Sequence, residues 1–242
     1  MSRPWLCVLA LAAVPLSAYA IDGEALLKQV DRNLNPPTYE AYRKIINIEP
    51  NGKRREFVMF TVKKDRDKVA MLFLSPATEK GRTTLRLGDN MWLYIPNVGK
   101  PVRITSLQSV VGGVFNNADI LSVDYSAEYS VERVEDAGAE NLLHLKAKNR
   151  TVAYDRLRMW VTKKSPQPTK IECVTAAGIL VKTLRFKDIK DFGGITRPAT
   201  VETDSPLQKG YRSTMIFANV KARALKDEVF TLAYMPKLDT LQ

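Results

Sequence analysis

The spacing of apolar residues changes from a helical to a strand period near the start of the chain. Within residues 22–34, Asp22 can cap a helix, and the apolar residues recur at helical spacing. They form one stripe made of Leu26, Leu27, Val30 and Leu34. Pro36 and Pro37 end this pattern because proline cannot continue a helix. We therefore predict an amphipathic helix over residues 22–34.

Beyond this helix, apolar residues alternate with polar ones, which is the pattern of half-buried β-strands. Turn signals such as Pro50-Asn51-Gly52 and Gly193-Gly194 separate most of the alternating segments. The predicted strands are Tyr39–Ile48, Arg55–Lys63, Lys68–Ser75, Arg82–Leu87, Asn90–Ile95, Pro101–Ser106, Ser126–Glu135, Asn141–Ala147, Arg156–Lys163, Thr169–Thr175, Ile179–Asp188, Thr196–Thr203 and Tyr211–Val220. Many short, evenly spaced strands indicate a large antiparallel sheet, a sandwich or a barrel with one buried face.

The strand at residues 90–95 is apolar on both faces. Met91, Leu93 and Ile95 share one face, and Trp92 and Tyr94 share the other. Trp and Tyr carry polar tips that tolerate partial exposure, so we assign the first three residues to the inner face. The outer face then needs cover from a chain segment, a partner or the neighbouring strands.

Residues 106–121 interrupt the strand pattern. Leu107, Val110, Val111 and Val114 have helical spacing, but Gly112-Gly113 would weaken a helix by roughly 1 kcal/mol per glycine. A second short helix could begin near Asn117. Two interpretations stay open for the first helix: a movable cover or a rigid packing element.

The N-terminus has the features of a secretory signal peptide. Arg3 precedes an apolar run from Trp5 to Leu16, which is too short to span a bilayer comfortably, and Ala18-Tyr19-Ala20 is a small-x-small cleavage pattern. We predict cleavage after Ala20, with an uncleaved anchor as the alternative. Residues 1–20 are then the signal peptide, residues 21–242 form one domain, and the protein is exported.

Composition and charge narrow the classes of partner. The chain has 242 residues and a formal net charge of +11, and removing Arg3 with the signal peptide leaves 11 − 1 = +10. Export makes nucleic acid an unsuitable partner, so we expect the partner to be an anionic membrane surface or an acidic protein. Alternatively, the positive charge serves solubility alone. Cys173 would be the only cysteine of the exported protein, which excludes an intramolecular disulfide.

No set of residues in the sequence predicts catalysis. The only histidine, His144, lies in a predicted strand, and nothing in the sequence places it beside Cys173. Too few His and Cys residues are present for a clustered metal site. We therefore predict no catalytic residue, no metal and no cofactor, and expect function by binding to buried apolar surface.

Several motifs resemble the LolA-type outer-membrane lipoprotein-sorting proteins, in their longer LolA-like branch. The main one is the run from Gly88 to Pro96, which contains Asp-x-x-Trp-x-Tyr-x-Pro. Other matching pieces keep the family's order along the chain: residues 73–76 with Lys80-Gly81 precede this run, and residues 113–120, 154–161, 210–215 and 226–231 follow it. The resemblance covers nearly all of residues 21–242.

The resemblance implies a mainly β fold: an incomplete, unclosed antiparallel β-barrel with α-helices covering its concave face. It implies a monomeric periplasmic carrier whose cavity holds acyl chains of a lipid or lipidated protein, received from an inner-membrane transporter and passed to an outer-membrane acceptor. A sensor or adaptor on the same scaffold is the alternative function. Classical carriers have a lid-locking arginine, for which Arg43, Arg82, Arg86 and Arg103 are the candidates here.

The residues assigned to the inner faces of the strands, taken together with this resemblance, predict which residues line the cavity. The predicted residues are Met59, Met71, Phe73, Met91, Leu93, Ile95, Val111, Phe115, Leu157, Met159, Leu184, Phe186, Met215 and Phe217. From the sequence, we expect Phe217→Glu on the inner face to lower lipid uptake or stability by several kcal/mol, because it would bury an unpaired charge. Arg212→Glu on the outer face should change little.

Overall fold

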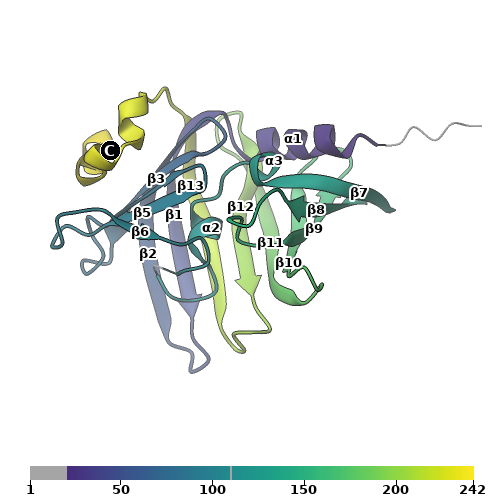
Figure 1. Cartoon of the computed structure of the whole chain (residues 1–242), viewed down its shortest axis with the longest axis horizontal. Coiled ribbons are helices and arrows are strands. Elements are labelled where there is room, and N and C mark those ends of the chain that lie inside the picture. Colours follow the sequence, from purple (N-terminus) through teal and green to yellow (C-terminus); the bar gives the residue numbers. More distant parts are fainter. Residues whose placement is uncertain (1–20, 110) are drawn as a thin grey trace, which may run out of the picture.

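A computed structural model describes residues 21–109 and 111–242, in which one antiparallel sheet of 13 strands dominates (Figure 1). The predicted signal peptide at residues 1–20 lies outside the described residues. The strands are β1 (Thr38–Ile48), β2 (Arg54–Lys64), β3 (Lys68–Ser75), β4 (Thr83–Leu87), β5 (Asn90–Tyr94), β6 (Val102–Ile104), β7 (Tyr129–Ala137), β8 (Glu140–Ala147), β9 (Arg156–Thr162), β10 (Pro168–Val174), β11 (Leu180–Asp191), β12 (Thr196–Asp204) and β13 (Arg212–Ala222). Every predicted strand is confirmed, with shifted ends.

The strand order runs β6-β5-β4-β3-β2-β1-β13-β12-β11-β10-β9-β8-β7. β1 and β13 pair in the middle of the sheet, where Ile45 lies opposite Met215. β6 and β7 are consecutive in the chain but lie at opposite edges, so the sheet stays unclosed. The predicted mainly β, incomplete barrel is therefore confirmed.

The connection from β6 to β7 must cross the sheet because it joins the two edges. It contains two short helices, α2 (Asn117–Ile120) and α3 (Tyr125–Glu128), and packs on the concave side (Figure 1). We call residues 111–123 the cover segment. The helix α1 (Gly23–Leu34) lies beside α3 and is the helix predicted from the first apolar stripe. Helices thus cover the concave face, as expected.

Specific polar contacts decide where the helices begin. The side chain of Asp22 accepts a hydrogen bond from the Ala25 amide at 3.0 Å and caps α1. Asp31, on α1, accepts the amides of Tyr125 and Ser126 at 2.7 and 2.9 Å, and so caps α3 from a distance. This contact explains why residues 126–128, predicted as strand, are helical instead.

The helix expected before Asn117 is not formed. Residues 106–109 and 111–116 contain no helix among the described residues, and Val110 lies outside them. Gly112 and Gly113 take φ values of +68° and +77°, which are incompatible with a right-handed helix. The short helix expected near Asn117 is confirmed, and Asn116 and Asp119 form its capping box.

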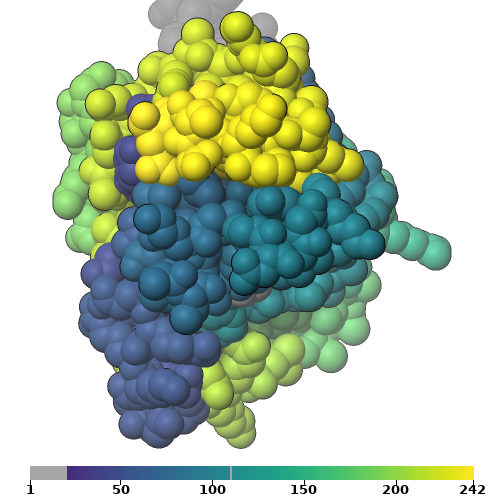
Figure 2. Space-filling view, turned by 90° about the vertical axis from the view of Figure 1, so that its left-hand side faces the viewer, coloured from purple at the N-terminus to yellow at the C-terminus, as the bar shows by residue number. Residues whose placement is uncertain are grey.

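A second apolar cluster on the convex face explains the doubly apolar strand β5. Met91 and Leu93 belong to the concave core, with Ile95 packed against it, whereas Trp92 and Tyr94 pack against the convex cluster. The convex cluster joins residues of β2–β4 to two C-terminal 3-10 helices, η1 (Asp227–Phe230) and η2 (Leu232–Leu241). In Figure 2 the C-terminal segment, in yellow, lies along the blue and teal surface of the first strands. A chain segment therefore supplies the cover that the sequence pattern required.

Candidate functional site

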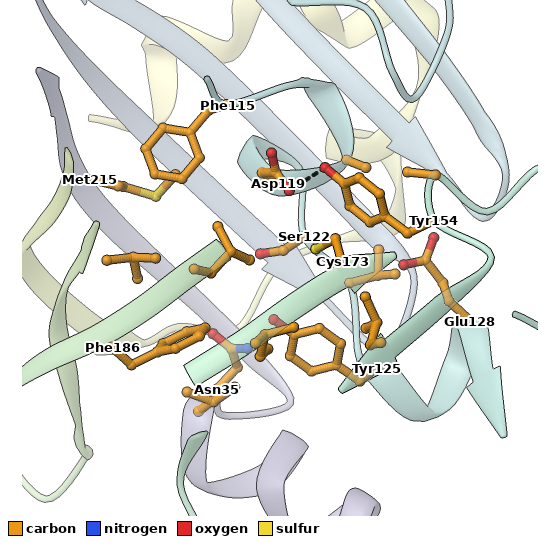
Figure 3. A pocket seen from close by; sticks show the side chains of 18 of the residues that line it. Asn35, Phe115, Asp119, Ser122, Tyr125, Glu128, Tyr154, Cys173, Phe186 and Met215 are labelled. Atoms are coloured by element: carbon orange, nitrogen blue, oxygen red, sulfur yellow. Dashed lines mark hydrogen bonds between the residues drawn. The ribbon is translucent and has the colours of Figure 1, made fainter. Parts of the chain in front are cut away.

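An apolar hollow of about 80 Å³ lies on the concave side, against β9 to β13 (Figure 3). Strands supply one wall, and α1, the cover segment, α3 and the segment before β9 supply the rest. The lining residues are Leu34, Asn35, Phe115, Ala118, Asp119, Ser122, Val123, Tyr125, Glu128, Tyr129, Ala153, Tyr154, Leu157, Ile171, Cys173, Leu184, Phe186, Arg197, Val201, Met215 and Phe217.

The structure brings six of the predicted cavity residues to this hollow: Phe115, Leu157, Leu184, Phe186, Met215 and Phe217. The others lie in the same apolar core but away from the hollow, namely Met59, Met71, Phe73, Met91, Leu93, Val111, Met159 and, at its margin, Ile95. The cover segment lies next to the hollow. It contacts β1, β4, β11 and β13, and its residues Phe115, Ala118, Asp119, Ser122 and Val123 line the hollow, which lies against β9 to β13.

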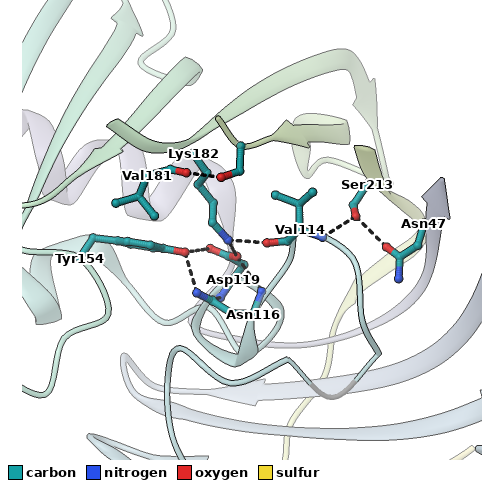
Figure 4. A network of polar contacts seen from close by, with 9 residues as sticks. Asn47, Val114, Asn116, Asp119, Tyr154, Val181, Lys182 and Ser213 are labelled. Atoms are coloured by element: carbon teal, nitrogen blue, oxygen red, sulfur yellow. Dashed lines mark hydrogen bonds and ion pairs between the residues drawn. The ribbon is translucent and has the colours of Figure 1, made fainter. Parts of the chain in front are cut away.

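On one side, the cover segment is fastened by a buried ion pair (Figure 4). Lys182, on β11, contacts Asp119 Oδ2 at 2.7 Å and donates to the carbonyl of Val114 at 2.6 Å. The side chains of Lys182 and Asp119 are both 5% exposed. The Tyr154 hydroxyl donates to Asp119 Oδ1 at 3.0 Å, and Asn116 donates to Tyr154. A charged network thus closes over the hollow from the β11 side.

Neutral hydrogen bonds fasten the cover segment to β1 and β13. The Val114 amide donates to Ser213 Oγ at 2.9 Å, and that hydroxyl donates to Asn47 Oδ1 at 2.7 Å. Asn47 Nδ2 donates to the Gly112 carbonyl at 2.9 Å. A Cβ atom added at Gly113 would lie 2.4 Å from Asn47 Oδ1, so only glycine permits this approach.

Two of the four candidate lid-locking arginines contact the end of α2. Arg43 is 2% exposed, and its Nη1 donates to the Ile120 carbonyl at 2.9 Å. Arg86 donates to the Leu121 carbonyl at 3.2 Å and pairs with Glu128. The other two have contacts elsewhere: Arg82 pairs with Glu79, and Arg103 contacts Asn90 and the Trp92 ring. Arg43 and Arg86 therefore hold the cover segment from β1 and β4.

The sequence prediction missed several polar residues of the site, including Asn47, Lys182 and Arg197. The available signal was their position in the strand, because every second residue of a strand points to the same face. Lys182 shares its parity with Leu184 and Phe186, and Arg197 shares its parity with Ala199 and Val201, so both point to the concave face. A basic residue in phase with inner apolar residues indicates an internal polar contact, because an unpartnered charge would be costly there.

Cys173 and His144 are the two reactive side chains considered from the sequence, and the structure shows the surroundings of each. Burial raises the pKa of the Cys173 thiol well above its usual value, so the thiolate needed for nucleophilic attack is disfavoured. His144, on β8, contacts Glu135 and Arg133 of the neighbouring edge strand β7. In residues 21–109 and 111–242, no group of three potential ligands could hold a metal ion. Over the same residues, no helix has the length and apolar character needed to cross a membrane.

The carboxyl of Asp31 predicts a pH dependence of stability. Burial raises its pKa from 3.8 to about 6. The folded protein therefore binds more protons than the unfolded chain between about pH 4 and 6, so its stability should increase as the pH falls through this window. We expect a gain of up to about 3 kcal/mol. Urea denaturation at pH 7.5 and 4.5 measures it, and Asp31→Asn should show a smaller gain. An equal gain in the variant would assign the effect to other groups.

Comparisons with known proteins agree with this architecture. A model of a family described as "Uncharacterized protein" matches residues 65–237. The crystal structure of a LolA superfamily protein from Nitrosomonas europaea is 25% identical, with a TM-score of 0.80, over 89% of this chain and 100% of that one. A search of curated proteins finds no match.

Two further crystal structures share the fold. A DUF1329 family protein from Desulfovibrio piger is 20% identical, with a TM-score of 0.75, over 88% of this chain and 97% of that one. A domain from Vibrio parahaemolyticus, provisionally assigned to outer-membrane lipoprotein sorting, is 18% identical, with a TM-score of 0.73, over 88% and 98%. The motifs from Gly88 to Pro96, the unclosed sheet and the full-length match to the Nitrosomonas europaea protein agree: the chain belongs to the LolA-like family.

Proposed function

We propose that the protein is a periplasmic carrier, formed by residues 21–242, that binds acyl chains of lipoproteins or other lipids and moves them toward the outer membrane. The single observation that supports this function best is the apolar hollow under a segment fastened by polar contacts on both sides. An inner-membrane transporter as donor, an outer-membrane acceptor and a monomeric carrier complete the proposal. They rest on the family resemblance and the predicted signal peptide.

The physical task of such a carrier is to keep methylene groups out of water. Each buried methylene contributes about 0.8 kcal/mol, so a single long acyl chain supplies a strong driving force for binding. Ligand cavities usually measure about 300–1,000 Å³, whereas this hollow has about 80 Å³. In this proposal the structure is the closed form, and loading requires the cover segment to move away from the sheet.

The contacts of the cover segment then set the affinity. The bonds from Lys182, Ser213 and Arg43 to the cover segment exist in the closed form and are lost on opening. Their loss offsets part of the gain from burying the acyl chain, which keeps binding reversible. Reversible binding is what a carrier needs in order to release its load to an acceptor.

A sensor or adaptor remains the alternative function, and the smallness of the hollow favours it if the cover segment never opens. From the sequence, a partner is one of three possible covers for the face of Trp92 and Tyr94, and such a partner would suit a sensor. The C-terminal 3-10 helices contact these two side chains, so they do not form a free surface.

The Gly113→Ala variant tests whether the cover segment opens to admit lipid. An added Cβ would collide with Asn47 Oδ1 and Ser213 Oγ, at 2.4 and 2.7 Å, and so should destabilise the closed form. We expect uptake of a fluorescent fatty-acyl probe to become severalfold faster than in the native protein. The matched control is Gly138→Ala, since Gly138 has a similar φ of +76° but no atom within 4 Å of the added Cβ.

Two results would contradict the carrier function. One is that neither the native protein nor Gly113→Ala takes up the probe. The other is that native mass spectrometry of protein purified without detergent shows no bound lipid even after incubation with lipid vesicles. Faster uptake in Gly138→Ala as well would trace the effect to backbone strain rather than to the cover segment.

A further inference from the structure

Two arginines are buried in the concave core, and the part of the chain that the structure describes gives neither an acidic partner. Arg43 and Arg197 are 2% and 4% exposed. Arg197 donates to Asn35 Oδ1 at 2.8 Å and to the Pro198 carbonyl at 3.3 Å, and Arg43 donates to Thr61 Oγ1 and the Ile120 carbonyl. All these partners are neutral. Within the described residues, neither guanidinium forms an ion pair with a carboxylate.

The two guanidiniums flank one ring at the wall of the hollow. The Cζ atoms of Arg197 and Arg43 lie 4.0 and 5.3 Å from the centre of the Phe217 ring. Arg197 and Phe217 both line the hollow. Burial lowers the pKa of Arg197 to about 10, so its side chain still carries a full positive charge at neutral pH. The apolar hollow therefore has a charged group in its wall.

The carboxylates near the hollow are already engaged with other groups. Asp119 pairs with Lys182 at 2.7 Å, and Glu128 pairs with Arg86. Neither of them neutralises Arg197. Removing a charge from water without an opposite charge is costly, and an acyl chain that fills the hollow would exclude water from Arg197 still further.

We infer that the ligand of this hollow is an acidic amphiphile whose anionic group binds Arg197. The chemistry is a carboxylate or a phosphate monoester attached to an apolar tail, as in a fatty acid or an alkyl phosphate. An anion beside the guanidinium would form a charge-assisted pair in place of an unpaired buried charge. An acyl chain attached to a protein through a neutral ester or amide would bring no such charge. This inference rests on the proposed lipid-carrier function and narrows its client.

The same geometry changes the expectation for Phe217→Glu. The sequence alone predicts an unpaired buried carboxylate at this position, but the structure places two guanidiniums around it. The new carboxylate would pair with them, so its cost to stability should be smaller than expected from burial alone. It would also occupy the site of the ligand's anionic group. Phe217→Glu should therefore lose its preference for acidic ligands.

Affinity for matched ligands tests the inference. Palmitate, hexadecyl phosphate and hexadecanol have tails of the same length and differ in head-group charge, and each is used to displace an uncharged fluorescent alkyl probe at pH 7.5. We expect the native protein to bind the two acids at least tenfold more tightly than the alcohol. Arg197→Gln should reduce this ratio to less than threefold, because the two acids lose their charged partner. The exposed-arginine control, Arg212→Gln, should keep the native ratio.

The outcomes separate this inference from the carrier function. Equal affinity of the native protein for palmitate and hexadecanol would overturn the acidic client and leave the carrier function intact. Displacement of the probe by inorganic phosphate alone would assign the site to a free anion and also overturn it. Failure of all three amphiphiles to bind, in Gly113→Ala as well, would remove the carrier function and the inference together. If Arg197→Gln does not fold, the test uses the ratio of acid to alcohol affinity in the native protein and in Phe217→Glu. The inference is wrong if these two ratios are equal.

Discussion

Replacing Lys182 by methionine should lower the free energy of unfolding by about 3–5 kcal/mol. Lys182 is one half of an ion pair whose two side chains are each 5% exposed. Methionine fills a similar volume but leaves the Asp119 carboxylate without its cation. It also removes the donor to the Val114 carbonyl. Breaking one side of a buried pair is costly mainly because the remaining charge stays buried.

Urea denaturation, followed by tryptophan fluorescence and circular dichroism, measures this loss. Lys187→Met is the matched control on the same strand, because Lys187 pairs with Glu202 at a site where both side chains are more than 40% exposed. Exposed pairs contribute about 0–1 kcal/mol, so the control should remain near native stability. The double variant Asp119→Leu/Lys182→Met should lose less than the sum of its single variants, because neither charge is then left alone.

A loss below 1 kcal/mol in Lys182→Met would contradict this role of the ion pair. An intermediate loss accompanied by faster uptake of the acyl probe has a specific meaning. It would show that the cover segment opens locally in the variant. The loss in stability then cannot exceed the free energy needed to open this segment in the native protein. The loss in stability and the rate of uptake together therefore measure the free energy that holds the cover segment on the sheet.

The strand pattern of this chain was predictable because burial on one face imposes a period of two. The segment at residues 156–163 shows this directly, since Leu157, Met159 and Val161 are all buried in β9. The amphipathic helix α1 was predictable for the corresponding reason at a period of 3.6. Turn residues at positive φ, such as Gly52 and Gly178, placed the ends of strands. Local patterns of this kind need no knowledge of the rest of the fold.

The cover segment and its fastening were not predictable in the same way. The apolar spacing of residues 107–114 matches a helix, but the chain meets Asn47 and Ser213 closely at Gly113, and this tertiary contact overrides the local pattern. The ion pair of Lys182 with Asp119 joins residues 63 positions apart. No spacing rule connects such residues. The position of the hollow over β9–β13 follows from the same long-range packing.

The C-terminal 3-10 helices escaped prediction because their contacts, rather than their periodicity, determine their position. η2 contains Pro236 and has no apolar stripe comparable with that of α1. Its buried residues, Met235 and Leu238, pack on β3 and β4 together with Phe230 of η1. The doubly apolar strand β5 was the signal that some cover was needed on this face.

Phe230→Ala should consequently lower the free energy of unfolding by about 3–5 kcal/mol. Phe230 is 3% exposed and packs in the convex cluster with Phe60, Leu72 and Leu85. Truncating its ring leaves a cavity between the C-terminal segment and the sheet, and the loss combines the lost apolar burial with that cavity. Thermal unfolding should show a correspondingly lower midpoint, and Trp92 fluorescence should report greater exposure of the convex face.

Leu232→Ala provides the matched control, because Leu232 is in the same segment but 41% exposed. Its loss should stay within about 0.5 kcal/mol, as for most exposed positions. Equal losses in the two variants would show that the C-terminal segment does not pack on β2–β4 in solution. A large loss of stability in Phe230→Ala alone, with uptake of the acyl probe unchanged, would show that the two faces of the sheet have different roles. The convex cluster would then stabilise the fold, and the concave face alone would hold the ligand.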